Sequence, residues 1–116
     1  MMAAITAAKA GSEVILLEKN EKIGKKLFIT GKGRCNVTNA CDTEDLFANV
    51  MEHSKFLYSA IYGYDNQAVM RFFEEAGCPL KIERGQRVFP ESDHSSDILR
   101  ALDRQLHQSG VKVRLH

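Results

Sequence analysis

Four apolar residues in a row, Val14–Leu17, follow an alanine-rich stretch, a glycine and two polar residues, Ser12 and Glu13. A continuous apolar run of this length is typical of a strand that is covered on both faces, as in a parallel sheet. The stretch before it, MMAAITAAKAG, predicts a helix that ends at Gly11, because glycine readily takes the left-handed position after a helix. Helix, tight turn and buried strand together predict the second half of a β-α-β unit.

The residue that ends this strand is acidic. A dinucleotide-binding unit has the order strand, glycine-rich turn, helix and second strand, with an acidic residue about 20 positions after the glycines. Glu18 occupies the acidic position, and counting back about 20 positions passes Met1. We therefore expect an α/β fold, a partial Rossmann-like domain of parallel strands with helices that is incomplete at both ends. We divide it into a dinucleotide-binding part, 1–41, and a helical segment with following strands, 42–116.

Beyond residue 41 the spacing of apolar residues predicts mainly helices. Asp42 or Thr43 is expected to cap a first helix, and Asp65 to cap a better defined helix that ends at Gly77. Short strands are expected in LKIER and RVF, on either side of Gly85. The remaining expected elements are a helical stretch at 56–61, a helix at 95–109 capped by Ser92 or Asp93, and a final strand in VKVRLH.

Composition narrows the class of protein. The chain has 116 residues and a formal net charge of +1, with 16 basic and 15 acidic residues, so its overall charge favours no polyanionic partner. No apolar run approaches the roughly 18 residues that a membrane helix needs. Three cysteines without a Cys-x-x-Cys pair, and four scattered histidines, indicate neither a disulfide scaffold nor a metal site. Reduced thiols without a signal peptide favour a cytoplasmic protein.

A polar loop rich in glycine, FITGKGRCNVTN, follows the predicted half-unit. Gly31 and Gly33 let backbone amides approach a ligand without an intervening Cβ. Lys32 and Arg34 add positive charge, while the asparagines and Thr38 add donors and acceptors for a ring system or a phosphate. The stretch is not a P-loop, because six residues rather than four separate its first glycine from the preceding one, and glycine follows the lysine.

Three residues allow two interpretations each. Glu18, at a strand end, can accept hydrogen bonds from the two hydroxyls of an adenosine ribose or can be an ordinary solvated glutamate, and its position alone leaves both open. Lys19 can reach a phosphate, although a surface lysine is the commoner outcome. Cys35 beside Arg34 can be a reactive thiol, since a neighbouring cation favours the thiolate, but the steric fit of a small residue in a tight loop is the stronger interpretation.

Two stretches carry a resemblance to a known family. EKNEKIGKKLFITGKGRCNVTN and, further along, GQRVFPESD resemble segments of the HI0933-like flavoproteins, bacterial NAD(P)/FAD-dependent oxidoreductases. The likeness runs from the first predicted helix to the final predicted strand, and its most specific part is Gly-x-Gly-Arg-Cys-Asn-x-Thr-Asn. The sequence departs from the family in lacking the first strand and the Gly-x-Gly-x-x-Gly turn.

The resemblance implies a site for FAD, with NAD(P)H as a candidate electron donor. FAD would lie extended, with its adenosine ribose at Glu18 and its pyrophosphate and flavin near the glycine loop. Lys32 or Arg34 near the pyrimidine end of the flavin would stabilise the anionic reduced form. The residues expected to bind the cofactor are Glu18, Lys19, Lys26, Thr30, Gly31, Gly33, Arg34, Cys35, Asn36 and Thr38.

Our leading hypothesis is the FAD-binding portion of a flavin-dependent oxidoreductase, an NAD(P)H-linked reductase or dehydrogenase whose substrate and catalytic residues the sequence does not name. The alternative is a non-catalytic fragment or small interaction module that does not bind FAD by itself. A third, weaker hypothesis is polyanion binding through the basic stretch Lys19–Arg34. The expected partners are a small-molecule cofactor and substrate, without nucleic acid or membrane, and unpaired strand edges predict self-association.

Overall fold

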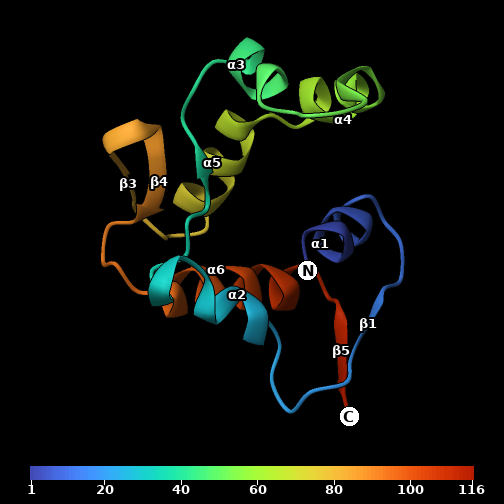
Figure 1. Ribbon diagram of the computed structural model, residues 1–116. Helices are drawn as coiled ribbons and strands as arrows, with labels where there is room; N and C mark the ends of the chain where they lie inside the picture. The colour runs from blue at the N-terminus through green and yellow to red at the C-terminus, as the bar shows by residue number, and fades with distance from the viewer.

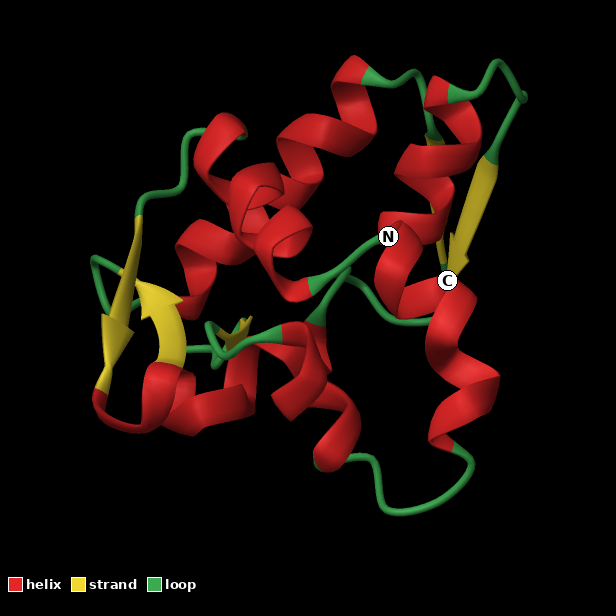
Figure 2. Cartoon of the chain, turned by 90° about the horizontal axis from the view of Figure 1, so that it is seen from above, coloured by secondary structure: helices red, strands yellow, loops and turns green.

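The computed structural model describes residues 1–116 as a mixed α/β fold with two small sheets (Figure 1). Helices lie between the sheets, which sit on opposite sides of the molecule in both views (Figure 2). The helices are α1 (Met2–Lys9), α2 (Lys25–Ile29), α3 (Thr43–Ala48), α4 (Tyr58–Gly63), α5 (Asn66–Glu75) and α6 (Ser95–Gln108). The strands are β1 (Ile15–Glu18), β2 (Thr38–Asn39), β3 (Leu80–Glu83), β4 (Arg87–Pro90) and β5 (Lys112–Leu115). Three short 3₁₀ turns are η1 (Thr30–Gly33), η2 (Ser54–Leu57) and η3 (Arg84–Gln86).

The first and last strands form a parallel pair. β1 pairs with β5 from Ile15 opposite Lys112 to Glu18 opposite Leu115. Helix α1 precedes β1, and the turn between them contains Gly11 in the left-handed conformation, at φ +95°. The predicted order of helix, glycine turn and strand is confirmed, as are the parallel strands of the predicted fold class.

One prediction about β1 is wrong: the strand is not covered on both faces. Leu17 is 78% exposed and Ile15 56% exposed, whereas Leu16 packs against the core. Side chains alternate across a strand, and only the face that carries Leu16 and Val113 meets the hydrophobic core. A two-stranded sheet with packing on one side leaves the other side to solvent.

The hydrophobic core is centred on α6. Ile98, Leu102 and Leu106 recur at helical spacing and are almost completely buried. They pack together with Ile5 of α1 and Phe73 of α5. The predicted helix at 95–109 is confirmed, and it holds the parallel pair and the α5 region in one core.

A three-stranded antiparallel sheet forms the other side of the molecule. Its order is β2-β4-β3, with β3 and β4 joined through η3, where Gly85 takes φ +75°. The two strands predicted around Gly85 are therefore confirmed. The third strand, β2, was not predicted, because it has two residues and pairs with residues almost fifty positions further along, Thr38 with Val88 and Asn39 with Arg87.

The predicted N-cap is confirmed for α5 but not for α6. Asp65 Oδ1 accepts a hydrogen bond from the backbone N–H of Ala68 at 2.7 Å, which confirms the predicted cap of α5. The prediction that Ser92 or Asp93 caps α6 is wrong, because the N-cap position is His94 and no side chain accepts a cap bond from the first turn of the helix. Ser92 Oγ instead accepts the backbone N–H of His94 itself, at 3.2 Å. Asp93 is engaged elsewhere, in ion pairs with Arg34 and Lys81.

Helices α3 and α4, with η2 between them, form an arm that is shown in green at the top of Figure 1. Phe47 and Tyr58 meet edge to face, with ring centroids 4.6 Å apart, and Tyr62 lies 5.4 Å from Phe47. Phe56 and Met51 on the same arm are exposed. The arm is thus held by a small aromatic cluster outside the main core.

Candidate functional site

A cavity of about 340 Å³ lies where β1 ends. Glu18 and Lys26, both predicted site residues, line it together with Met1, which directly precedes α1. In parallel α/β units the helix N-terminus and the carboxyl end of the strand meet at the same edge of the sheet, where ligands bind. Residues that are distant in sequence are thereby brought to one place, at the position expected for a dinucleotide.

The carboxylate of Glu18 is oriented by Asn20. Its Oε1 accepts hydrogen bonds from the backbone N–H of Asn20 at 2.9 Å and from the Asn20 side-chain amide at 2.6 Å. These two bonds lower the pKa of Glu18, so the group is ionised at neutral pH. Both hydrogen bonds from Asn20 end on Oε1 and leave Oε2 unused by Asn20. Sequence reasoning missed Asn20, although an asparagine two residues after an acid at a strand end is a recognisable turn signal.

Lys26 is placed by α2, which is anchored against α6. Gly24 begins α2 in the left-handed conformation, and a Cβ there would lie 2.2 Å from Leu99 Cδ2. The hydroxyl of Ser95, at the start of α6, donates to the Phe28 carbonyl at 2.7 Å. Two contacts with one helix therefore set the path of the chain from the cavity to the glycine loop.

The glycine loop is tightly wound. Gly31, Lys32, Gly33 and Cys35 all have positive φ, between 57° and 84°. At Gly31 a Cβ would lie 2.9 Å from the backbone nitrogen of Asn36, so a side chain would force the loop to shift. At Gly33 a Cβ would meet nothing within 4 Å, and only its φ of +84° favours glycine.

The thiol of Cys35 is part of the core. The residue is 1% exposed, and burial raises the pKa of its thiol. A buried, protonated thiol is a poor nucleophile, which supports the steric interpretation and not the reactive one. Cys35 packs in the same cluster as Cys78, and all three cysteines of the chain are unpaired thiols.

The end of the loop is fixed to β4. Val37 donates its backbone N–H to the Val88 carbonyl at 2.8 Å, and Thr38 stands opposite Val88 in the β2–β4 pair. With its side-chain amide turned to suit its neighbours, Asn36 donates to the carbonyls of Val88 and Thr38 at 3.2 and 3.0 Å. The Thr30 hydroxyl at the other end donates to the Leu27 carbonyl. Asn36 and Thr38 therefore bind the end of the loop to β4, and Thr30 binds its start to α2.

Arg34 is the centre of an ion-pair network. Its Nε lies 2.8 Å from Asp93 Oδ1, and its Nη2 lies 2.5 Å from Glu83 Oε1. Lys81 Nζ lies 2.7 Å from Asp93 Oδ2. The guanidinium carbon is 4.1 Å from the centroid of the Phe89 ring, a cation–π distance. Sequence reasoning missed these partners, because they lie about 50 to 60 residues after Arg34 and no local pattern links them.

The predicted site residues thus fall into two groups. Glu18 and Lys26 line the cavity, with Lys19 exposed beside Glu18. Thr30 to Thr38 form the loop that lies against the three-stranded sheet, connected to the first group through α2.

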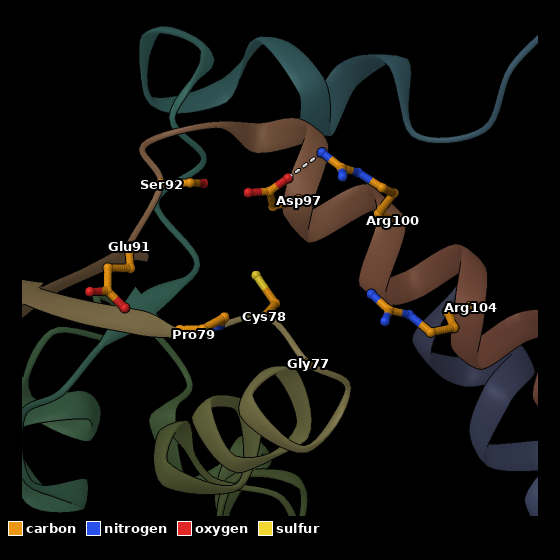
Figure 3. A pocket seen from close by; sticks show the side chains of 8 residues that line it. All are labelled: Gly77, Cys78, Pro79, Glu91, Ser92, Asp97, Arg100 and Arg104. Atoms are coloured by element: carbon orange, nitrogen blue, oxygen red, sulfur yellow. Dashed lines mark hydrogen bonds and ion pairs between the residues drawn. The ribbon is translucent and has the colours of Figure 1, made fainter.

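Another cavity, of about 400 Å³, lies between the α5–β3 turn, the end of β4 and α6 (Figure 3). Its charges balance: Arg100 and Arg104 face Glu91 and Asp97, and Arg100 is bonded to Asp97. The thiol of Cys78 points into it, and burial raises the pKa of that thiol. None of the predicted site residues lines this cavity.

Two further features bear on function. No group of three or more His, Cys, Asp or Glu side chains is arranged to hold a metal ion. None of the helices has the length and apolar character that crossing a bilayer requires.

Comparison with known proteins decides the family. A family described as HI0933-like protein Rossmann domain matches residues 1–116, the whole chain. The chain belongs to the HI0933-like family. The resemblance predicted from the glycine loop is therefore confirmed, and with it the Rossmann character of the fold, in a family of FAD-binding proteins.

Two curated relatives of this HI0933-like chain are named for an enzymatic activity. The 3-dehydro-bile acid delta(4,6)-reductase of Clostridium scindens is 33% identical over 115 residues, covering 97% of this chain and 27% of the relative. The ribosomal RNA dihydrouridine synthase of Haemophilus influenzae is 28% identical over 116 residues, covering 99% of this chain and 28% of the relative. The chain thus spans little more than a quarter of the length of these relatives.

Proposed function

We propose that these residues are the FAD-binding portion of a flavin-dependent oxidoreductase, with NAD(P)H as the electron donor. The observation that carries the proposal is the Glu18 carboxylate, held by Asn20 at the end of β1 in the same cavity as Lys26 and the start of α1. An ionised carboxylate at this point of a Rossmann unit suits the vicinal hydroxyls of an adenosine ribose.

The residues present fit an anionic dinucleotide. Both bonds from Asn20 end on Oε1 of Glu18, which leaves Oε2 for a ribose hydroxyl. Lys19, Lys26 and the loop Thr30–Thr38 add positive charge and polar groups along the path of an extended cofactor.

FAD, when bound, supplies the electron transfer, and the protein supplies binding and orientation. In this proposal Glu18 fixes the adenosine end and Lys26 neutralises phosphate charge. The backbone of Gly33, where a Cβ would meet nothing within 4 Å, admits the cofactor close to the loop. One relative is named a reductase, which agrees with this class of reaction. The relatives' names mention a bile acid and ribosomal RNA, so the substrate of this chain is not assigned.

A direct test compares FAD with FMN, which lacks the adenosine. The protein is produced from its complete reading frame, and binding is followed by quenching of flavin fluorescence and by thermal stability. We expect saturable binding of FAD, and a ligand at 100 times its Kd stabilises the folded state by about 2.7 kcal/mol. Glu18→Gln should weaken FAD binding roughly tenfold, about 1.4 kcal/mol, and leave FMN binding unchanged.

Glu21→Gln is the matched control, because Glu21 is an exposed glutamate three residues away that pairs only with Lys25. It should bind FAD like the wild type. An unmodified protein that does not bind FAD, or a Glu18 variant that binds it with full affinity, would refute the proposal.

A second candidate function follows from the small part of each relative that this chain matches. Since 27% to 28% of each relative is matched, other parts of such proteins can supply essential cofactor contacts. In that case the 116 residues alone would be a module that does not bind FAD, while the protein from the complete reading frame would. Measuring FAD binding by both samples side by side separates the two.

A further inference from the structure

The glycine loop holds a backbone that is unfavourable by itself. Two of its residues with positive φ are not glycine, Lys32 at 57° and Cys35 at 60°. The left-handed conformation costs a residue with a Cβ about 1–2 kcal/mol. The loop has few internal bonds to offset this cost: Arg34 N–H donates to Gly31 O at 3.1 Å, and Cys35 N–H donates to Thr30 O at 3.0 Å. Contacts from outside the loop must therefore hold it.

Arg34 supplies such contacts from its side chain, in addition to the bonds that Val37 and Asn36 make with Val88. Its guanidinium is bonded to Glu83 on β3 and to Asp93 after β4, and it stacks on Phe89 of β4. Lys81 joins the same network through Asp93 and lies 3.6 Å from Glu83. Because all these partners belong to one antiparallel sheet and its exit, the network joins the loop to a single framework.

The charge of Arg34 is used within this network. Two cations, Arg34 and Lys81, meet two carboxylates, Glu83 and Asp93, so the cluster is neutral overall. The hydrogen bond from Arg34 lowers the pKa of Glu83, and bonds from Lys81 and Arg34 lower the pKa of Asp93. Both carboxylates are thus ionised at neutral pH, and the four side chains pair with one another.

Lys32 differs from Arg34 in its exposure and in its lack of ion-pair partners. It lies at the tip of the loop between Gly31 and Gly33, is exposed, and takes part in none of the ion pairs or side-chain hydrogen bonds of the structure. Its ammonium group is therefore the loop cation that can meet a ligand. The two basic residues of one short motif have different environments and so different tasks.

We propose that Arg34 is a positioning residue, which clamps the glycine loop to β3 and the end of β4, and that Lys32 is the loop cation that binds an anionic group of the cofactor. This inference rests on the proposed function and refines it, since it separates two residues that the motif places together. It predicts that removing Glu83, which is not a cofactor-binding candidate, acts on the loop through Arg34.

The first test needs no cofactor. Amide hydrogen exchange of Arg34 and Cys35, whose N–H groups bond within the loop, is compared in wild type, Glu83→Gln, Asp93→Asn and Lys32→Gln. Loss of a clamp contact should speed exchange at these two amides roughly tenfold in the Glu83 and Asp93 variants, because opening the loop becomes easier by about 1.4 kcal/mol. Lys32→Gln should exchange like the wild type. Equal exchange in all four proteins would overturn the clamp.

The second test uses FAD and the protein from the complete reading frame. Glu83→Gln should weaken FAD binding several-fold. The double variant Arg34→Gln with Glu83→Gln should bind FAD no more weakly than Arg34→Gln alone, because both changes break the same contact.

Lys32→Gln should weaken FAD binding and reduce the dependence of that binding on salt, whereas Glu83→Gln should keep the dependence. Additive losses from Arg34 and Glu83, or a reduced salt dependence in Glu83→Gln, would refute the separation of tasks. If the wild type does not bind FAD, the proposed function fails, while the exchange test still decides the clamp.

Discussion

At the scale of single residues, the two glycines of the loop are not equivalent. Both have positive φ, yet the space around them differs. A Cβ at Gly31 would meet the backbone of Asn36 at 2.9 Å, and a Cβ at Gly33 would point into open space. The requirement for glycine is thus steric and conformational at Gly31 but only conformational at Gly33.

This difference predicts unequal costs of substitution. Gly33→Ala should lower the free energy of unfolding by about 1–2 kcal/mol, the cost of a left-handed alanine. Gly31→Ala should lower it further, because the contact is with backbone, which cannot rotate away. Urea denaturation of the two variants and the wild type measures both values. Equal losses would show that the close approach to Asn36 has no energetic consequence.

At the scale of elements, the helices show how local sequence signals act. The N-cap of helix α5 is Asp65, whose side chain accepts the Ala68 N–H, and the apolar residues of the helix lie on one face. The N-cap of helix α3 is Asp42, which has the same extended backbone but makes no side-chain cap bond. Two aspartates at two helix N-termini thus provide a natural comparison.

Removing the cap bond should destabilise only one of these helices. Asp65→Ala should lower the free energy of unfolding by about 1 kcal/mol, the usual value of an N-cap bond. Asp42→Ala should change it by less, because only the favourable charge near the helix N-terminus is lost. Thermal denaturation followed by circular dichroism gives both shifts. A larger effect at Asp42 than at Asp65 would contradict the capping geometry.

At the scale of the whole molecule, burial separates leucines that look alike in sequence. Leu106 of α6 is fully buried in the core formed with α1 and α5, whereas Leu17 of β1 is largely exposed. The difference arises because β1 and β5 form a two-stranded sheet with one face packed on the helices. Stability therefore depends on α6 far more than on the outer face of the parallel pair.

Alanine substitution should make this contrast measurable. Leu106→Ala should lower the free energy of unfolding by about 2–5 kcal/mol, the range for a large-to-small change in a packed core. Leu17→Ala should change it by about 0.5 kcal/mol or less, as for other surface positions. Guanidinium denaturation of both variants tests the prediction. A comparable loss at Leu17 would mean that its face is covered in solution, for instance by the self-association that unpaired strand edges predict.

The sequence by itself determined what depends on neighbours along the chain. The spacing of Ile98, Leu102 and Leu106 determined a helix, Asp65 determined where α5 begins, and the order of helix, glycine and apolar run determined the parallel unit that ends at Glu18. The glycine loop was also recognisable, because its density of glycine and polar residues has no use in a core. All of these are short-range signals of backbone preference and side-chain period.

Only the tertiary structure decided what those residues contact. It paired β1 with β5 across almost a hundred residues and left Leu17 in solvent. It placed Glu83 and Asp93 beside Arg34, which turned a predicted cofactor contact into the centre of an ion-pair network. The physical reason is the same in each case: a side chain's partner is set by how distant segments pack, and no local pattern carries that information.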